Sequence, residues 1–410
     1  MPVLLPDDLN FPLPKMHRVA QSFPRNTLSD VKAAVEAQMA KEEILQKITL
    51  GARVAVAVGS RGIQNLPLIV KTVIDCIKEA GGAPFIVSAM GSHGSGTAEG
   101  QREVLTVYGI TEETMGVPIV TEVEVEHLGK TPAGIDVFFD KVALEADLIV
   151  PINRVKLHTD FVADIQSGLC KMLVIGLGNH IGCTAMHESD FDVFGETLLD
   201  AVEVIFQSRA KVGFGIAILE NAYDETEHIE VIPQETLVAR EKELVVRARE
   251  NMPILMIPEI DVLIVQEIGK NISGAGFDPN ILGKSFILKE FVLPVPKISK
   301  MVLLDLTEET HGNGIGMGLF DIITKKVFDQ LDLEPIYANA VAIKFPEDAK
   351  IPLIAPSDDH AIRTGIKVLR GVDRDNLKIV KIKNTLELDE IEVSEALLPV
   401  VAANDRLALL

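Results

Sequence analysis

Two strand–loop–helix units follow each other directly near the start of the chain, and they constrain the fold more than any other feature. In the first unit, the apolar run 53–59 leads through a glycine-containing loop to a helical pattern at 66–81. The second unit repeats this order, with a strand at 83–91 and a helix at 98–109. Strands that alternate with helices in this way are typical of parallel sheets. The sequence therefore predicts an α/β fold with mainly parallel sheets flanked by helices.

The length of the chain predicts two domains, because 410 residues exceed what one ordinary core accommodates. Prolines in the segment 252–260 mark a boundary, and a second series of strands and helices begins after it. We predict an N-terminal α/β catalytic and cofactor-binding domain at 1–255 and a C-terminal α/β domain at 256–410. The active site is expected in the cleft between them, since domain interfaces are common ligand sites.

Other segments give simpler expectations. Apolar residues at helical spacing predict one helix over 28–48 and another over 321–332. The alternating segment 118–129 predicts an edge strand or a hairpin arm, and the apolar run 146–153 predicts a buried strand.

The charge balance bears on the partners of the protein. A formal net charge of −21, from 60 acidic and 39 basic residues, argues against nucleic acid and against an anionic membrane surface. A small molecule is the expected ligand. The three cysteines show no CxxC spacing, so neither a disulfide framework nor a thiolate zinc site is indicated. With no basic signal region and no apolar run near the roughly 20 residues of a membrane span, the sequence predicts a cytoplasmic protein.

Each of the first two strand-to-helix loops carries one side chain suited to ligand binding. Arg61 stands in the loop after 53–59, and His93 stands in the loop after 83–91. Ligands of parallel sheets bind beyond the carboxyl ends of the strands. Arg61 therefore suits an oxyanion, because a guanidinium holds two oxygens at once. The alternatives are a surface ion pair for Arg61 and a turn residue for His93.

The stretch after the third strand combines a lysine with histidines. His158 lies just past 146–153, and Lys171 interrupts an apolar run. A desolvated lysine sheds its proton and becomes a nucleophile, which suits covalent attachment of a cofactor. The alternative is that the Lys171 stem is buried while its head reaches water. His180 and His187 follow; His180 is either a structural histidine or a partner of the site.

The second half of the chain offers two further candidates. Lys270 and Lys284 flank a glycine-rich loop that follows the strand 261–269. Either lysine suits a substrate carboxylate, although surface lysines without such a role are common.

Taken together, the segments GSRG, MGSHGSGT, KLHTDF and SGLCK resemble the nickel-pincer-nucleotide lactate racemase family (LarA-like). His187, sixteen positions after Lys171, completes the match. The resemblance implies that Lys171 carries pyridinium-3-thioamide-5-thiocarboxylic acid mononucleotide and that His187 binds its nickel. It also implies that His93 and His158 exchange the hydroxyl proton of the substrate.

The resemblance further implies that Ser60 and Arg61 contact the phosphate end of the cofactor and that Lys284 holds the substrate carboxylate. The implied function is a racemase or epimerase of a 2-hydroxy acid that works by proton-coupled hydride transfer. Cofactor-maturation proteins are the implied partners.

Three departures from the family pattern indicate a divergent subgroup. Val58 stands where the lactate racemases carry an acid, the interval from His158 to Lys171 is longer than theirs, and the chain has no tryptophan. A tryptophan-lined lactate pocket is therefore excluded, and we expect a different 2-hydroxy acid as the substrate.

Two other readings stay open. In a zinc hydrolase, His93, His158 and His187 would ligate the metal, although the chain has no HExxH pair. In a non-catalytic α/β binding protein, the same residues would bind a small molecule without turnover.

Overall fold

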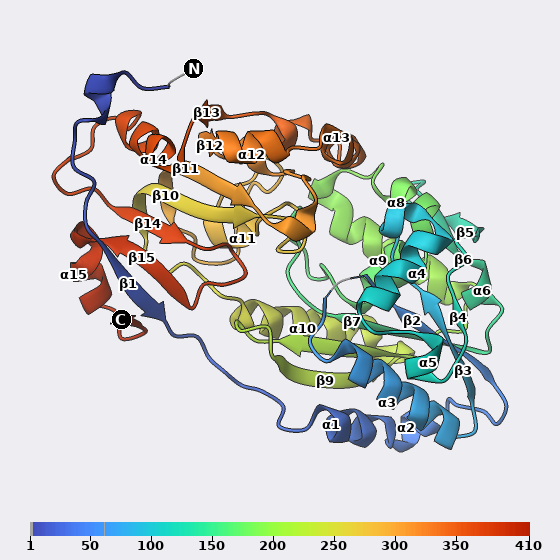
Figure 1. Cartoon of the computed structure of the whole chain (residues 1–410). Helices are drawn as coiled ribbons and strands as arrows, with labels where there is room; N and C mark the ends of the chain where they lie inside the picture. The colour runs from blue at the N-terminus through green and yellow to red at the C-terminus, as the bar shows by residue number, and fades with distance from the viewer. Residues whose placement is uncertain (1–2, 61) are drawn as a thin grey trace. The chain divides into compact units, whose positions relative to one another are not determined.

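The computed structural model describes residues 3–60 and 62–410, which form two compact units (Figure 1). The N-terminal unit is Arg25–Met252. The C-terminal unit combines Met1–Pro24 with Pro253–Leu410. Both are α/β units with mostly parallel sheets, so the predicted fold class is confirmed.

The N-terminal unit is built on a six-stranded sheet in the order β4-β3-β2-β7-β8-β9. Only the β8/β9 pair is antiparallel among these neighbours. The chain builds the sheet outward from β2 to β4 and then returns to the other side of β2 with β7. The strands are β2 (Arg53–Val58), β3 (Ala83–Ser88), β4 (Ile119–Val120), β7 (Leu148–Arg154), β8 (Phe214–Glu220) and β9 (Thr226–Pro233).

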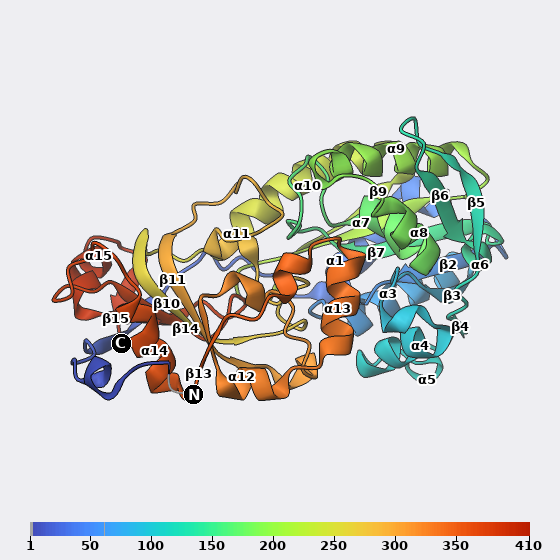
Figure 2. The same ribbon diagram turned by 90° about the horizontal axis from the view of Figure 1, so that it is seen from above.

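Helices cover both faces of this sheet, and Figure 2 shows α3, α4 and α5 on one side and α9 and α10 on the other. The first set is α1 (Val31–Met39), α2 (Glu42–Leu45), α3 (Leu66–Glu79), α4 (Ala98–Val107) and α5 (Glu112–Met115). The second set is α7 (Leu169–Lys171), α8 (Asn179–Met186), α9 (Phe194–Gln207) and α10 (Leu237–Asn251). A hairpin of β5 (Val125–Lys130) and β6 (Asp136–Asp140) and the short α6 (Lys141–Leu144) complete the unit.

The two faces of β2 differ in side-chain size. Val54, Val56 and Val58 are fully buried in the core that includes α3. Ala55 and Ala57 point to the opposite face, because side chains alternate along a strand. Gly59 continues that face, and a Cβ there would lie 3.0 Å from the Met172 Cε. Small residues on this face therefore let the segment that carries Lys171 approach the end of β2.

The C-terminal unit holds an eight-stranded sheet in the order β13-β12-β11-β10-β14-β15-β1-β16. The pairs from β13 to β14 are parallel and those from β14 to β16 are antiparallel. The strands are β1 (Met16–Gln21), β10 (Glu259–Ile268), β11 (Lys297–Leu306), β12 (Ile322–Thr324), β13 (Leu353–Ala355), β14 (Ile379–Ile382), β15 (Glu390–Ser394) and β16 (Leu407–Leu409). The helices are α11 (Pro279–Leu282), α12 (Lys325–Gln330), α13 (Leu333–Ala342), α14 (Asp358–Lys367) and α15 (Leu398–Ala402).

Two predicted helices differ from the structure. The segment 28–48 forms α1 and α2 instead of one helix, because Lys41 is extended between them. The break brings both Met39 and Ile44 into the core, although a spacing of five residues would separate them on a straight helix. Within 321–332, the β-branched Ile322–Thr324 forms β12 and helix α12 begins only after it. The segment 118–129 supplies both the edge strand β4 and the hairpin arm β5.

The division predicted at residue 255 placed the first 24 residues in the N-terminal domain. In the structure, this segment belongs to the C-terminal unit. Figure 1 shows the blue strand β1 beside the red strand β15, and the register pairs Val19 with Ile391. Gln21 further attaches β1 to the C-terminal unit. Its side chain donates a hydrogen bond to the Leu388 carbonyl at 2.7 Å and accepts one from the Met256 N–H at 2.9 Å.

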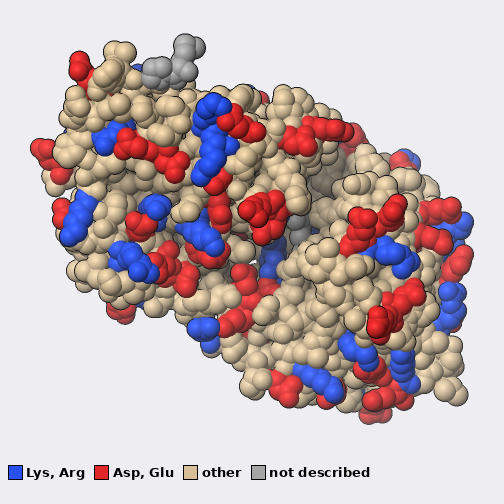
Figure 3. Space-filling view, viewed as in Figure 1, with Lys and Arg blue, Asp and Glu red and all other residues tan. Residues whose placement is uncertain are grey.

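Charged side chains of both signs are interspersed on the face of the molecule that Figure 3 shows. Several form ion pairs, such as Lys325 with Asp329 at 2.5 Å. Among the described residues, no single helix is long and apolar enough to cross a membrane. One pair of helices, Leu169–Gly176 and Asn179–Met186, passes that test together and is bent by 108°.

Replacing Gln21 by leucine is expected to lower the free energy of unfolding by about 2 to 4 kcal/mol, because two buried backbone groups lose their partner. The matched control is Arg18→Gln on the same strand, which removes only the exposed ion pair with Glu390 and should cost about 1 kcal/mol or less. Urea unfolding followed by circular dichroism measures both. Equal effects of the two changes would contradict the role assigned to Gln21.

Candidate functional site

The candidate site lies where the order of strands in the N-terminal sheet reverses. Strand β2 sits between β3 and β7, and all three run parallel. Their carboxyl ends lead to Ser60, His93 and His158, so the structure brings the three predicted strand ends to one edge. In open parallel sheets, the crevice at such a reversal point is the usual ligand site. Arg61, the candidate that the sequence predicted in the first loop, lies outside the described residues.

His93 is held by its neighbours at the ends of β2 and β3. Its Nδ1 contacts the Ser60 hydroxyl in a hydrogen bond. The Tyr108 hydroxyl donates to the Ser60 carbonyl at 3.0 Å, which fixes that loop. The cofactor contact predicted for Ser60 stays a prediction; the contact present here is with His93.

A buried glutamine shapes the loop before His93. Gln101 is fully buried, accepts a hydrogen bond from Ser88 at 2.5 Å and donates to the Gly91 carbonyl at 3.3 Å. Gly91 has φ of +60°, and a Cβ there would lie 3.2 Å from the Ile175 carbonyl oxygen. Glycine at this position therefore lets the His93 loop approach the helical segment that carries Lys171.

His158 and Lys171 are in direct contact, at 2.6 Å between Nε2 and Nζ. The His158 ring stacks on Phe161 with 4.4 Å between ring centroids, and its Nδ1 accepts the Asp160 backbone N–H at 3.1 Å. Lys171 is half-buried. The Lys171 amine is thus bonded to a histidine of the site. This contact favours a role for Lys171 in cofactor attachment over a lysine whose amine is only solvated.

The segment that carries Lys171 is an interrupted helix. The single turn α7 ends at Lys171, a π-helical turn follows at Met172–Gly176, and α8 begins at Asn179 after a bend of 108°. Asn179 adopts a left-handed backbone with φ of 50°, and its amide donates to the buried Asp140 carboxylate at 2.9 Å. π-helical turns inside helices are frequent at functional sites.

Glu241 caps the start of this helix from α10, and the sequence analysis missed it. It is fully buried, and its Oε2 accepts the backbone N–H groups of Leu169 and Cys170 at 2.8 and 3.0 Å. Burial raises the pKa of Glu241 to about 7, although the two backbone hydrogen bonds act to lower it. A Cβ at Gly168 would lie 2.5 Å from Oε1, so only glycine allows this approach.

The helical pattern of α10 could have indicated that Glu241 is buried. Its buried positions recur at helical spacing, and the only charged residue among them is the glutamate; they are Leu237, Glu241, Leu244, Val245 and Ala248. A carboxylate on an apolar helix face predicts a buried partner, although the pattern does not say which one.

His187 ends α8 and is oriented by Cys183, one turn earlier. The His187 Nδ1 lies 2.6 Å from the Cys183 carbonyl oxygen, so Nδ1 carries the hydrogen and Nε2 carries the lone pair. Metal-binding histidines are commonly oriented in this way. His187 therefore fits the role of a nickel ligand through Nε2, and Lys171 fits the covalent attachment.

The Cys183 thiol and the His187 ring also influence each other, at 3.7 Å between Sγ and Nδ1. Burial raises the pKa of the Cys183 thiol, but the imidazole outweighs it and leaves that pKa below its usual value. Burial lowers the pKa of His187, but its bonds to Cys183 leave that pKa above its usual value.

The zinc-hydrolase reading finds no support in the described part of the chain. There, no group of three or more histidine, cysteine, aspartate or glutamate side chains is placed to hold a metal ion. His93 and His158 instead bond to Ser60 and Lys171. His180 is exposed, so it is not an enclosed structural histidine.

The two lysines of the second half lie in the C-terminal unit, on the connection between β10 and β11. Lys270 donates to the Gly274 carbonyl at 2.7 Å. Lys284 follows the left-handed Gly283 that ends α11 and is half-buried. Their role toward a substrate carboxylate stays a prediction.

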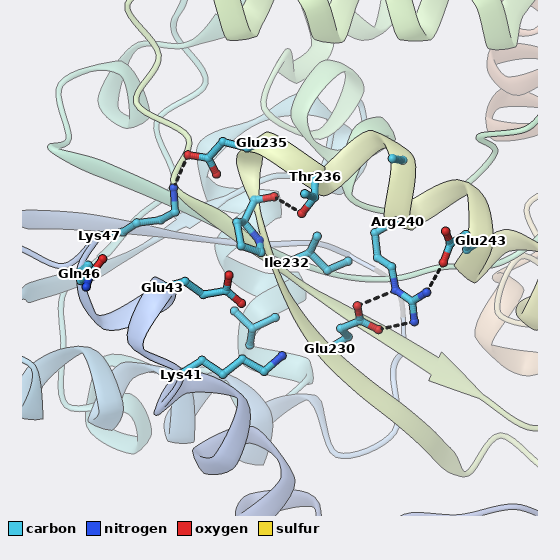
Figure 4. Close-up of a pocket in the computed structure, with 13 residues that line it drawn as sticks. Lys41, Glu43, Gln46, Lys47, Glu230, Ile232, Glu235, Thr236, Arg240 and Glu243 are labelled. Atoms are coloured by element: carbon cyan, nitrogen blue, oxygen red, sulfur yellow. Dashed lines mark hydrogen bonds and ion pairs between the residues drawn. The ribbon is translucent and has the colours of Figure 1, made fainter.

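A separate hollow in the N-terminal unit contains none of the predicted site residues (Figure 4). It lies between α2, β9 and α10, and several of its charged groups pair with one another. Lys47 contacts Glu235 at 2.6 Å, and Arg240 contacts Glu230 at 2.6 Å and also Glu243. Because these cations already hold carboxylates, this hollow is a poor candidate for an anionic substrate.

The structure defines an α/β protein with a lysine and two histidines at the reversal point of a parallel sheet. Comparison with known proteins agrees with this class. Residues 9–194 match the family model of the lactate racemase N-terminal domain. No curated protein matches the chain.

The fold is also that of a solved lactate racemase. The structure of the lactate racemase apoprotein from Thermoanaerobacterium thermosaccharolyticum matches with a TM-score of 0.54 over 94% of this chain and 95% of that chain, at 13% sequence identity. The match to the family model and the shared fold support the predicted resemblance to the lactate racemase-like family. The match to the lactate racemase N-terminal domain supports a racemase-type isomerase.

Glu241→Gln is expected to remove a pH dependence of stability. Because the folded pKa of about 7 lies above the usual 4.5, the native protein loses stability as the pH rises through that interval. Between pH 4.5 and pH 8 the loss is about 3 kcal/mol relative to the glutamine variant, which does not ionise. Urea unfolding at the two pH values measures it, and parallel curves for both proteins would refute the assignment.

Proposed function

We propose that the protein is a racemase or epimerase of a 2-hydroxy acid, with a nickel-pincer nucleotide attached to Lys171. The observation that carries the proposal is the 2.6 Å contact between Lys171 and His158 at the reversal point of the sheet. The match of residues 9–194 to the lactate racemase N-terminal domain supports the isomerase class. The proposal includes a cytoplasmic location and cofactor-maturation proteins as partners.

The cofactor would be held by residues already described. Lys171 would carry the pyridinium-3-thioamide-5-thiocarboxylic acid mononucleotide, and His187 would bind nickel through Nε2. We assign Arg61 and Ser60 to its phosphate end. When bound, this group would supply a hydride acceptor beside the substrate carbon.

The histidines would move the hydroxyl proton. The C–H of a 2-hydroxy acid is only weakly acidic, so removing its hydrogen as a proton is difficult. A base that takes the hydroxyl proton while hydride leaves the carbon gives a transient 2-oxo acid. Imidazole suits this exchange because its usual pKa is about 6.5. His93 and His158 come from loops on two different strands, so each can serve one enantiomer.

We propose that the substrate is a 2-hydroxy acid other than lactate. The chain lacks any tryptophan to line a lactate pocket. Val58, fully buried in the core, bears on the cofactor instead, because its position cannot reproduce the contact that the acid found in lactate racemases makes with the nucleotide. We assign the substrate carboxylate to Lys284, with Lys270 as the second candidate.

Racemisation in deuterium oxide tests the reaction type. The protein that carries the cofactor is incubated with a panel of enantiopure 2-hydroxy acids. The products are separated by chiral chromatography, and their masses are measured by mass spectrometry. Hydride transfer predicts racemised product with hydrogen kept at C2, because the hydride does not exchange with solvent. Deuterium at C2 would indicate proton abstraction instead, and no racemisation of any acid would favour a binding protein.

His93→Gln is expected to lower kcat by about 10² to 10⁴ while the mass of the loaded protein and its nickel content stay unchanged. The reason is that His93 moves a proton but does not hold the cofactor. The matched control is His180→Gln, an exposed histidine on α8, which should leave kcat within about twofold. An active His93 variant would remove this residue from the mechanism.

A further inference from the structure

We infer that the Asp160 backbone amide, the His158 ring and the Lys171 amine form a network that holds Lys171 as an uncharged amine, ready for acylation. His158 then has a task that precedes turnover. The inference rests on the proposed function only for the identity of the acyl group.

The tautomer of His158 follows from the Asp160 contact. The Asp160 N–H donates to Nδ1 at 3.1 Å, so Nδ1 must carry a lone pair. A neutral imidazole has one N–H and one acceptor nitrogen, which places the hydrogen on Nε2. A doubly protonated ring would set a second N–H against the amide. A flipped ring would put carbon atoms at both contacts.

The protonation state of Lys171 follows from the tautomer. Nε2 lies 2.6 Å from Nζ, which is hydrogen-bonding distance. Because Nε2 is the donor, Nζ must accept, and only an uncharged amine has the lone pair to do so. An ammonium group has three donors and no acceptor.

The surroundings keep the ring in this orientation. The His158 backbone N–H donates to Oε1 of the buried Gln166 at 2.8 Å, and the ring stacks on Phe161 at an interplanar angle of 28°. These contacts restrain rotation of the imidazole.

Among the described residues, the titratable groups near the network include Asp160, Cys183, His187 and Glu241. The Asp160 carboxylate would favour a protonated ring, but its Oδ2 is 3.8 Å from Nδ1, farther than the backbone amide. Cys183 and His187, on α8, contact each other at 3.7 Å between Sγ and Nδ1. Glu241, on α10, is occupied by the backbone N–H groups of residues 169 and 170.

Acylation of Lys171 by a thiocarboxylic acid then needs no proton donor or acceptor other than His158. The amine nitrogen attacks the acyl carbon, a C–N bond forms, and the C–S or C–O bond breaks. His158 passes its Nε2 proton to the leaving sulfur or oxygen and takes one from the nitrogen, so hydrogen sulfide or water departs and the ring is unchanged. The new amide-type nitrogen is not basic and no longer accepts from Nε2. Loading thereby releases His158 to serve the substrate.

The test measures how the reactivity of Lys171 depends on pH. The full chain, produced without maturation proteins, is treated briefly with acetic anhydride between pH 6 and pH 9, and the labelled peptides are quantified by mass spectrometry. Lys32 and Lys325, 62% and 60% exposed, are internal references. An ordinary lysine gains about tenfold in reactivity per pH unit in this range. Lys171 is expected to change by less than about threefold overall. Comparing slopes removes differences in access.

The matched variant is His158→Phe, which keeps a ring to stack on Phe161 and removes both nitrogens. Its Lys171 should regain the slope of the reference lysines. A reference-like slope in the native protein, or a flat slope in the variant, would overturn the inference. If the variant does not fold, nitrogen-15 shifts of His158 in the native protein decide the matter, since a hydrogen on Nδ1 contradicts the network.

These measurements need neither nickel nor substrate. A flat Lys171 slope in a protein that never racemises a hydroxy acid would leave the network standing and remove the proposed function. Racemisation by a protein whose Lys171 has the same pH slope as the reference lysines would support the proposed function and overturn the network.

Discussion

The parallel pairing of β2 with both β3 and β7 is the constraint on which the site depends. It brings the ends of three strands that are far apart in the chain to neighbouring places on one edge. Ser60, His93 and His158 follow these ends. The alanines on one face of β2 then admit the helical segment that carries Lys171, so the sheet supplies both the edge and the space above it.

A second constraint is the buried cap of the lysine helix. Glu241 supplies an acceptor for two backbone N–H groups that would otherwise be buried without a partner. The cap fixes where α7 begins, and the π-helical turn and the bend after it set the direction of α8. Lys171 and His187 are thus presented from two differently directed parts of one interrupted helix.

Local patterns allowed much of this to be predicted from the sequence. The repeat of strand, glycine loop and helix predicted the parallel sheet, and the strand ends predicted where His93 and His158 lie. Contacts across long separations were not predictable in this way. Glu241 bonds to a residue 72 positions away, and β1 pairs with β15 at the other end of the chain, so neither partner shows in a local pattern. The break at Lys41 was missed because 28–48 has helical spacing on both sides of it.

The central claim is that Lys171 is the attachment point of a nickel-bearing nucleotide. The most direct measurement is the intact mass and metal content of protein co-expressed with cofactor-maturation proteins in the presence of nickel. The account predicts a mass increment of one sulfur-bearing pyridinium mononucleotide with bound nickel, both lost in Lys171→Ala and both kept in the exposed Lys211→Ala control. An unmodified mass with zinc or no metal under those conditions would contradict it.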